Sequence, residues 1–335
     1  MKYKVLGNTG LSVSTLCLGT MTFGGKGIYQ VVGTLGQAAV NELFKRAVEA
    51  GINFIDTANI YSEGMSEELT GQAIRNLGLK RDDLVIATKV CAAMGPGVND
   101  KGLSRKHIMQ QVEASLKRLN TDYIDLYQAH AYDPITPLEE TLRAFDDLVT
   151  SGKVRYIGAS NNGAWHLMKA LACAEKHNLH PYISMQSHYS IATRELEREI
   201  IPALTDQHVG LMVWSPLCAG LLSGKYKRNG EATDAGRYKQ YSFIPVDTAR
   251  AFNILDVLHT MAAEKGVTVA QLSLAWLLHQ SAVTSVIIGA NKLSQLNDNL
   301  QSTDVQFTEQ ELQQLDEVSK LPVEYPNWIF NWRNR

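Results

Sequence analysis

The chain has 335 residues, of which 45% are hydrophobic and 20% charged, and its formal net charge is −2. This balance excludes the strongly basic surface that nucleic acid or an anionic membrane would require, so neither is an expected partner. No apolar run reaches membrane-spanning length, the start of the chain lacks a signal-peptide core, and the four cysteines have neither paired nor metal-ligand spacing. We therefore expect a cytoplasmic protein with reduced thiols and no metal.

Short apolar runs rich in β-branched residues alternate with amphipathic segments along the whole chain. The first 15 residues predict a hairpin that turns at residues 8–10. Eight buried strands are then expected at residues 16–19, 53–56, 84–89, 124–130, 154–158, 183–186, 211–214 and 286–289. Eight strand–helix units without a linker predict a single (β/α)8 TIM barrel domain over residues 1–335, with the hairpin at its lower end and an extra C-terminal helix. A doubly wound sheet is the alternative, but the glycine-rich dinucleotide motif expected after its first strand is missing.

Three helix starts show a capping-box pattern, in which a threonine is followed three residues later by Glu or Gln. The pairs are Thr136 with Glu139, Thr268 with Gln271, and Thr308 with Glu311. Pro137 would occupy the first position of the first of these helices, and Gly152 would end it.

Two connections are longer than the repeat requires, and such excursions at the carboxyl side of barrel strands are typical of binding loops. The glycine-rich stretch Phe23–Gln37 follows the first barrel strand, and its Tyr29 and Val31-Val32 are candidates for a substrate pocket. The second stretch, Ala219–Val246, carries basic and aromatic residues: Lys225, Tyr226, Lys227, Arg228, Arg237 and Tyr238. Solvated surface is the alternative interpretation of both.

Polar or aromatic residues end nearly every predicted strand. They are Asp56, Lys89, His130, Ser160-Asn161, Gln186, Trp214 and Gly289. Taken singly, Asp56 with Lys89 could be a structural ion pair and His130 a hydrogen-bonded core histidine. Because barrel enzymes carry their chemistry at the carboxyl ends of the strands, the joint placement indicates an active site.

Four segments at these strand ends resemble signatures of the aldo-keto reductase superfamily. They are residues 51–61 followed by Ser66-Glu67, residues 123–130 followed by Asp133, residues 152–161, and residues 287–290 with Gln295 and Asn299. The similarity runs from about Tyr3 to Leu321. Residues 215–225 are similar to the branch that contains potassium-channel β subunits and their bacterial relatives.

The resemblance implies a barrel that binds an extended nicotinamide cofactor and a catalytic tetrad of Asp56, Tyr61, Lys89 and His130. Reduction of a carbonyl group places negative charge on oxygen, which a proton donor must meet. Tyrosine, with an ordinary pKa of about 10, is a weak acid for this task, and a neighbouring Lys89 ammonium would lower that pKa. Asp56 would hold Lys89 charged, and His130 would orient the carbonyl oxygen.

The resemblance also assigns residues to the cofactor. Ser160, Asn161 and Gln186 would bind the nicotinamide carboxamide, and Trp214 would stack on its ring. The pyrophosphate would be wrapped by Ser215, Pro216, Leu217, Gly220, Leu222, Gly224 and Lys225. The adenosine end would meet Ile288, Gly289, Lys292, Gln295, Asp298 and Asn299. Lys292 at the 2′-phosphate favours NADP over NAD, and a structural helix role is the alternative for Asp298.

The sequence departs from the family pattern at three places. Many relatives have glycine after the tyrosine, whereas this chain has Ser62-Glu63-Gly64. The glycine-rich stretch after the first strand is not part of the common motif. The aromatic tail, residues 325–332, is expected to pack over the barrel, to border the substrate cleft or to form a subunit contact in a homo-oligomer.

The leading functional hypothesis is the reversible NADPH-dependent reduction of a small aldehyde or ketone to the alcohol. A regulatory cofactor-binding subunit with little turnover is the alternative, although the sequence shows no extra N-terminal segment that would act as a tethered effector. A lyase or isomerase using Lys89 as a Schiff-base nucleophile is the third hypothesis, and an aspartate partner disfavours it because that lysine must be neutral. The sequence leaves the substrate undecided among sugars, small aldehydes, quinones and bulky ketones.

Overall fold

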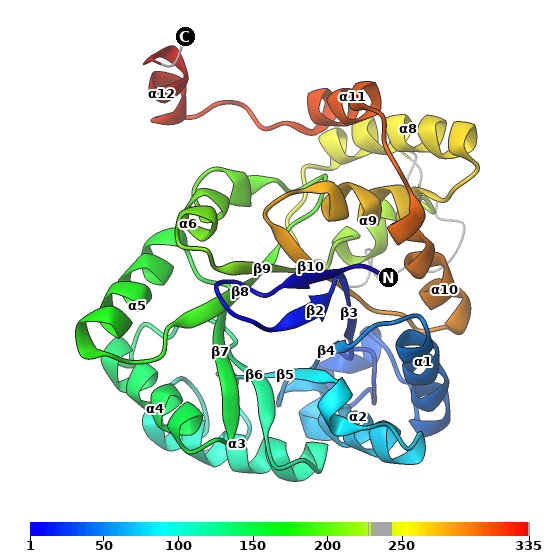
Figure 1. The fold of residues 1–335 in the computed structure, drawn as a ribbon. Helices are drawn as coiled ribbons and strands as arrows, with labels where there is room; N and C mark the ends of the chain where they lie inside the picture. Colours follow the sequence, from blue (N-terminus) through cyan, green and yellow to red (C-terminus); the bar gives the residue numbers. More distant parts are fainter. Residues whose placement is uncertain (227, 229–242, 334–335) are drawn as a thin grey trace.

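Eight parallel strands close into a barrel in the computed structural model, which describes residues 1–226, 228 and 243–333 (Figure 1). The barrel strands are β3 (Leu16–Gly19), β4 (Phe54–Asp56), β5 (Val85–Val90), β6 (Ile124–Ala129), β7 (Val154–Ser160), β8 (Tyr182–His188), β9 (Gly210–Trp214) and β10 (Val283–Ile288). They follow one another around the barrel in chain order, and β10 pairs with β3 to close it. The predicted barrel is confirmed, and the largest difference is at β10, which begins at Val283 rather than Val286.

Helices surround the barrel on the outside (Figure 1). These helices are α1 (Gln37–Glu49), α2 (Met65–Asn76), α3 (Arg105–Leu119), α4 (Leu138–Thr150), α5 (Ala164–His177), α6 (Ile200–Asp206), α8 (Thr248–Lys265), α9 (Val269–His279), α10 (Leu293–Gln301) and α11 (Glu309–Ser319), and a further helix, α12 (Asn327–Arg333), lies outside this ring. Short 3-10 turns are η1 (Gly27–Val31), η2 (Tyr61–Gly64), η3 (Arg81–Asp83), η4 (Glu195–Glu197), η5 (Cys218–Ser223) and η6 (Ser302–Asp304). A membrane-crossing helix, long and apolar throughout, does not occur among the described residues.

The predicted N-terminal hairpin is confirmed as β1 (Tyr3–Val5) paired antiparallel with β2 (Ser12–Ser14). Leu6 and Val13 are fully buried against residues inside the barrel, so the hairpin plugs the amino-terminal end. Gly7 has φ +60°, and a Cβ there would lie 2.1 Å from the carbonyl oxygen of Ile183, so only glycine fits this contact. With the lower end closed, the opposite end is left as the open mouth.

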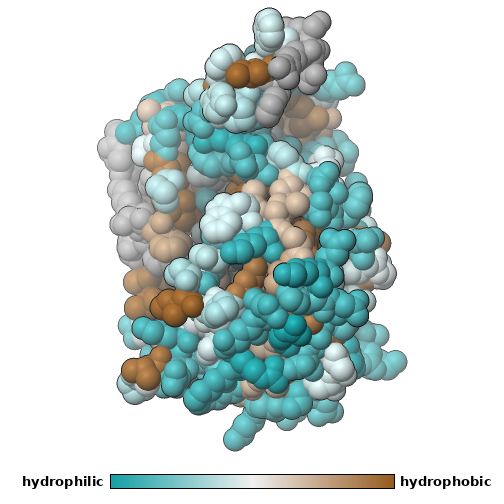
Figure 2. All heavy atoms as spheres, turned by 90° about the vertical axis from the view of Figure 1, so that its left-hand side faces the viewer, coloured by the Kyte–Doolittle hydropathy of each residue, from teal (hydrophilic) through white to brown (hydrophobic). Residues whose placement is uncertain are grey.

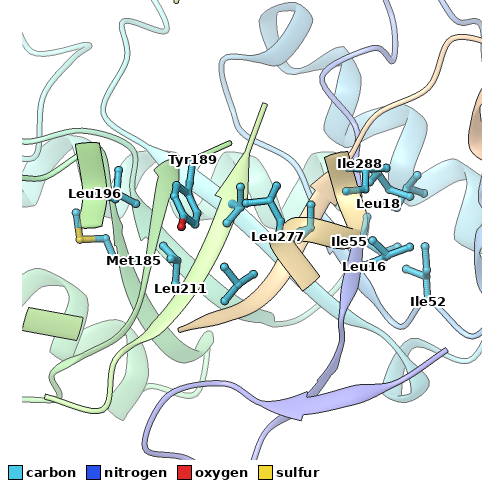
Figure 3. Packing of buried hydrophobic residues seen from close by; sticks show 14 of the residues in the cluster. Leu16, Leu18, Ile52, Ile55, Met185, Tyr189, Leu196, Leu211, Leu277 and Ile288 are labelled. Carbon is cyan, nitrogen blue, oxygen red and sulfur yellow. The ribbon is translucent and has the colours of Figure 1, made fainter. Parts of the chain in front are cut away.

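Most of the apolar core lies between the barrel wall and the surrounding helices. Figure 3 shows Leu16 and Leu18 of β3 gathered with Ile288 of β10, and these side chains belong to one cluster that also takes in the helices. All six residues of β5 are buried, as expected for a parallel strand that is covered on both faces. The strands are therefore rigidly held, and their carboxyl ends form a fixed rim.

The predicted capping box at Thr136 is wrong. Helix α4 begins at Leu138 with Pro137 as its N-cap and no side-chain cap. The Thr136 hydroxyl instead donates to Asp133 Oδ2 at 2.7 Å, and the same oxygen accepts from the backbone N–H of Leu103. Asp133 thus gathers the donors of this loop, and the Thr136 hydroxyl faces it and makes no capping bond to α4. The capping boxes at Thr268 and Thr308 are confirmed, as is the left-handed Gly152 after α4.

The extra C-terminal helix is present as α11, and the aromatic tail beyond it ends in α12. Figures 1 and 2 show α12 standing apart from the barrel, on the side that carries α6. Tyr325, Trp328 and Trp332 are 74%, 54% and 74% exposed, so these side chains neither pack over the barrel nor border the mouth. A contact with a second subunit stays a prediction.

Candidate active site

A cavity of about 430 Å³ opens at the carboxyl ends of the barrel strands. Most of the site residues expected from the sequence line it: Asp56, Tyr61, His130, Asn161, Gln186, Trp214, Ser215, Pro216, Leu217, Gly220, Ile288, Gly289 and Asn299. Apart from Asn299 of α10, they lie at or after the ends of six different strands, and the shared rim of a parallel barrel brings them together.

Lys89 lies fully buried in β5, behind the wall of this cavity. Its ammonium donates to Asp56 Oδ2 at 2.5 Å, to the carbonyl oxygen of Thr57 at 2.8 Å and to Tyr61 Oη at 3.2 Å. The three protons of the ammonium thus have three acceptors. Burial is the largest single influence and works to lower the pKa of Lys89, but Asp56 and Tyr61 together, through their charge and their hydrogen bonds, outweigh it and raise that pKa. A lysine held charged in this way is unsuited to Schiff-base chemistry.

Tyr61 begins the 3-10 turn η2 directly after β4, and only 9% of its side chain is exposed. Its ring meets the ring of His130 edge to face, with centroids 5.8 Å apart and planes at 76°. The hydroxyl therefore reaches Lys89 on one side, while the side chain lines the cavity together with His130.

His130 follows β6, and its half-buried ring is part of the cavity wall. Burial, aided by the positive charge of Lys89, lowers the pKa of His130 to about 3. The ring is therefore neutral at physiological pH, with one nitrogen protonated and able to donate a hydrogen bond. This protonation state could not be read from the sequence.

The low pKa of His130 has a measurable consequence for the pH dependence of activity. A fall in pH from about 8 to about 5 does not charge a ring whose pKa is about 3, so kcat/KM should show no acid-side break attributable to it. The measurement is kcat/KM across this range for wild type and His130→Gln. The variant should be slower but have the same acid limb. A wild-type break near pH 6.5 that His130→Gln lacks would contradict the lowered pKa.

The second carboxylate oxygen of Asp56 is held by two amides. Gln186 Nε2 donates to Asp56 Oδ1 at 2.8 Å and Gln128 Nε2 donates to it at 3.2 Å. Gln128 is fully buried in β6 and was missed in the sequence. It lies two residues before His130, and strand alternation puts both on one face, which was the signal available. The amides fix Asp56 and so the direction in which it holds Lys89.

Asn161 and Trp214 are joined across the mouth. The indole Nε1 of Trp214 donates to Asn161 Oδ1 at 3.0 Å, and Asn161 Nδ2 donates to the carbonyl oxygen of His130 at 2.9 Å. Asn161 has a left-handed φ of +54°, while its neighbour Ser160 is fully buried and does not line the cavity. The aromatic ring at the end of β9 is thereby fixed relative to the histidine at the end of β6.

The loop after β9 has a strained backbone. Ser215, Cys218 and Ala219 have φ of +49°, +47° and +55°, a conformation that non-glycine residues adopt mainly where a ligand or an active site requires it. Gly220 lines the cavity, and a Cβ placed on it would lie 4.0 Å from Lys225 Cε, so the lysine stem runs beside the cavity wall.

Other residues of this loop do not reach the cavity. Leu222 is fully buried, and Gly224 packs so closely on Val269 that a Cβ would lie 3.0 Å away. Both shape the loop from behind. The predicted loop residues Lys227, Arg237 and Tyr238 lie outside the described residues.

At the far end of the mouth, Asn299 of α10 lines the cavity, but its neighbours on that helix do not. Lys292 is the exposed N-cap of α10, and Gln295 accepts from the backbone N–H of Asn291 at 2.9 Å. Asp298 accepts from Thr268 Oγ1 at 3.1 Å and from Gln271 at 2.7 Å. These bonds tie α10 to the start of α9 and favour the structural role for Asp298.

Several cavity residues were not anticipated. They are Thr20, Met21, Thr22 and Leu274, whereas Ala219, Phe243 and Ile244, which also line the cavity, belong to the predicted second loop. The first three directly follow β3, so the strand-end rule that found Asp56 would also have found them. The described part of the chain holds no cluster of three or more His, Cys, Asp or Glu side chains arranged to bind a metal ion.

Comparison with known proteins agrees with this geometry. The model of the aldo/keto reductase family matches residues 15–320. A probable voltage-gated potassium channel subunit beta from Arabidopsis thaliana is 39% identical over 91% of this chain and 92% of its own length. The uncharacterized oxidoreductase YrpG of Bacillus subtilis is 38% identical over 95% of this chain and 96% of its own length. A putative aryl-alcohol dehydrogenase of Schizosaccharomyces pombe is 38% identical over 94% of this chain and 95% of its own length. The chain belongs to the aldo/keto reductase family and is an oxidoreductase of the carbonyl-reducing kind.

Proposed function

We propose that this chain catalyses the NADPH-dependent reduction of an aldehyde or ketone to the alcohol, and the reverse reaction, with Tyr61 as the proton donor. One observation carries the proposal: a buried, charged Lys89 is bonded to both Asp56 and Tyr61 Oη at the edge of the cavity. This is the arrangement that makes a phenol more acidic.

The chain's own residues would act on the carbonyl oxygen. With that oxygen between Tyr61 Oη and His130, the neutral imidazole would donate a hydrogen bond that holds it in place. As negative charge develops on the oxygen, Tyr61 would transfer its proton, and the phenolate left behind would be stabilised by the Lys89 ammonium. In the reverse direction, the phenolate would take the alcohol proton.

The cavity fits a nicotinamide dinucleotide, because it extends from Tyr61 past Trp214 to Asn299. When bound, this cofactor would supply or accept the hydride. Asn161 and Gln186 would hold its carboxamide, with buried Ser160 supporting Asn161, and Trp214 would cover the ring. Residues 215–220 with Lys225 would hold the pyrophosphate, and Lys292 at the N-terminus of α10 would meet the 2′-phosphate of NADP.

The direct test is carbonyl-dependent oxidation of NADPH by the purified protein over a panel of aldehydes and ketones. We expect turnover with several members of the panel and no oxidation without a carbonyl compound. NADPH that binds tightly but is not oxidised with any of them would instead favour a cofactor-binding regulatory subunit, and the Arabidopsis relative is named a probable channel subunit.

The preference for NADPH should depend on Lys292. Lys292→Ala removes the charge expected to face the 2′-phosphate, so kcat/KM for NADPH should fall by about 5- to 20-fold, while kcat/KM for NADH changes little. The matched control is Lys45→Ala, since Lys45 is also an exposed helical lysine, paired with Glu49 at 3.8 Å on α1. An equal fall for both cofactors would remove Lys292 from the phosphate site.

A further inference from the structure

Two departures from the family pattern meet in space. One is the glycine-rich stretch Phe23–Gln37 after β3, of which residues 23–35 are called the segment below. The other is Ser62-Glu63, within the turn η2 that begins with Tyr61. No sequence pattern connected these two features. The structure joins them by hydrogen bonds and by close packing.

Ser62 is the centre of this junction and is fully buried. Its hydroxyl donates to the carbonyl oxygen of Phe23 at 2.9 Å and accepts from the backbone N–H of Gly25 at 2.9 Å. A Cβ on Gly24 would lie 2.9 Å from Ser62 Cβ and 2.9 Å from Met65 Sδ. The glycine-rich segment is therefore hydrogen-bonded to the turn η2, and the contact leaves no room for a side chain at position 24.

The backbone of the turn is strained to make this contact. Ser62 and Glu63 have φ of +50° and +58°, two successive left-handed residues that are not glycine. A Cβ on Gly27 would lie 2.9 Å from Glu63 Oε1, so the second residue also packs against the segment. Strain of this kind persists only where the surrounding structure holds it, and it is found mainly at functional sites.

Two further hydrogen bonds, one just before the segment and one in its second half, tie it to the loop before α10. Asn291 Nδ2 donates to the carbonyl oxygen of Val32 at 2.9 Å, and Thr22 Oγ1 donates to that of Ala290 at 3.1 Å. A backbone bond from Gly24 to Leu35 at 2.9 Å closes the segment on itself. The segment is thus fixed on both sides of η1.

The turn η1 forms that middle and presents one ring to the cavity. Ile28 and Val31 are 75% and 45% exposed, whereas Tyr29 lines the cavity. The Tyr29 ring lies edge to face against Tyr61, with centroids 5.6 Å apart and planes at 61°. Trp214 and Phe243 line the same cavity, and their ring centroids are 6.4 Å apart.

We propose that Tyr29 is a specificity-determining residue for carbonyl compounds that carry an aromatic ring, and that Ser62 is the positioning residue that fixes it. The inference rests on the proposed carbonyl reduction. A ring wall held beside Tyr61 offers edge and face contacts to a flat aromatic substrate, and a puckered aliphatic ring of the same size cannot use them as well. Ser62 acts only through the segment, by keeping Tyr29 in place.

The test compares benzaldehyde with cyclohexanecarbaldehyde, which differ in the planarity of a six-membered ring. Tyr29→Ala should lower the ratio of kcat/KM for the two aldehydes by about 2- to 10-fold, the range expected for one aromatic contact. Tyr29→Phe should keep the wild-type ratio because the ring remains. Ile28→Ala, an exposed neighbour in the same turn, is the matched control and should also keep it.

The role of Ser62 needs a separate variant. Ser62→Ala removes the hydrogen bonds of the Ser62 hydroxyl to Phe23 and Gly25. The ratio of kcat/KM for the two aldehydes should therefore fall, while the Kd for NADPH, measured by fluorescence, stays unchanged. Ser62→Gly also removes the hydroxyl but relieves the left-handed strain, so it serves if the alanine variant does not fold. A merely structural role would lower kcat/KM for both aldehydes equally.

The outcomes separate the two proposals. If the wild-type protein does not oxidise NADPH with any of the carbonyl compounds tested, the proposed reduction is wrong. Wild type that is active, with an aldehyde ratio that Tyr29→Ala leaves unchanged, would overturn the specificity role alone. An unchanged ratio or an equal loss on both aldehydes in the Ser62 variants would overturn the positioning role.

Discussion

Tyr61→Phe is expected to lower kcat for carbonyl reduction by about 10²- to 10⁴-fold, the usual contribution of a positioned proton donor. The substitution removes the hydroxyl that Lys89 approaches at 3.2 Å and leaves the ring in its contact with His130. The loss should therefore appear in the chemical step, and the Kd for NADPH should not change. Single-turnover oxidation of bound NADPH, with a saturating aldehyde, measures that step directly.

The cavity supplies a matched control for this variant. Tyr29→Phe also removes one tyrosine hydroxyl from a residue that lines the cavity, but the three acceptors of the Lys89 ammonium are Asp56, Thr57 and Tyr61. It should retain most of the wild-type rate. If Tyr61→Phe reduces carbonyl compounds as fast as wild type, the proton comes from elsewhere and the proposed role of Tyr61 is lost.

The sequence predicted the parts of the site that depend on strand ends. Asp56, Lys89 and His130 come directly at or after buried apolar runs, and parallel strands in a closed barrel leave little freedom in where such residues meet. The structure brings all three to one mouth, with the tyrosine of the following turn beside them. The regular recurrence of buried strands along the sequence was sufficient to predict these three residues of the site.

Interactions between distant side chains could not be predicted in the same way. Asp298 was assigned to the cofactor, and the structure shows both of its oxygens accepting hydrogen bonds at the start of α9. Gln128 was assigned no role, and it donates to Asp56. Thr136 fitted a capping box, but Asp133 competes for its hydroxyl. The first two outcomes depend on a partner far away in sequence, and the third depends on which of two nearby groups the Thr136 hydroxyl faces. Local spacing encodes neither.

When substitutions of Lys89 and Asp56 are combined, we expect stability to recover and activity to stay low. Lys89→Met leaves a buried carboxylate without its cation, which is expected to cost about 3–5 kcal/mol in the free energy of unfolding. Asp56→Asn leaves the ammonium without its anion, with a comparable cost. In the double variant neither charge remains buried, so much of the lost stability should return.

Activity should not return with stability, because the proton donor still lacks the ammonium that acidifies it. Each single variant and the double variant should therefore have similarly low kcat, as expected for residues that act as one unit. Urea unfolding and kcat measured on the same four proteins give the two comparisons. A double variant that recovers activity along with stability would show that the pair serves only the fold.

A second ion pair in the barrel tests whether the effect is specific to the mouth. Arg81 donates to Asp125 at 2.6 Å, and both side chains are mostly buried, with 18% and 12% exposed. Arg81 belongs to η3, which precedes β5, whereas Lys89 lies near the end of that strand. Arg81→Met should lower stability but leave kcat close to wild type, since no hydrogen bond links Arg81 to Tyr61 among the described residues. Position along the strand then separates an ion pair that holds the barrel together from one that tunes a proton donor.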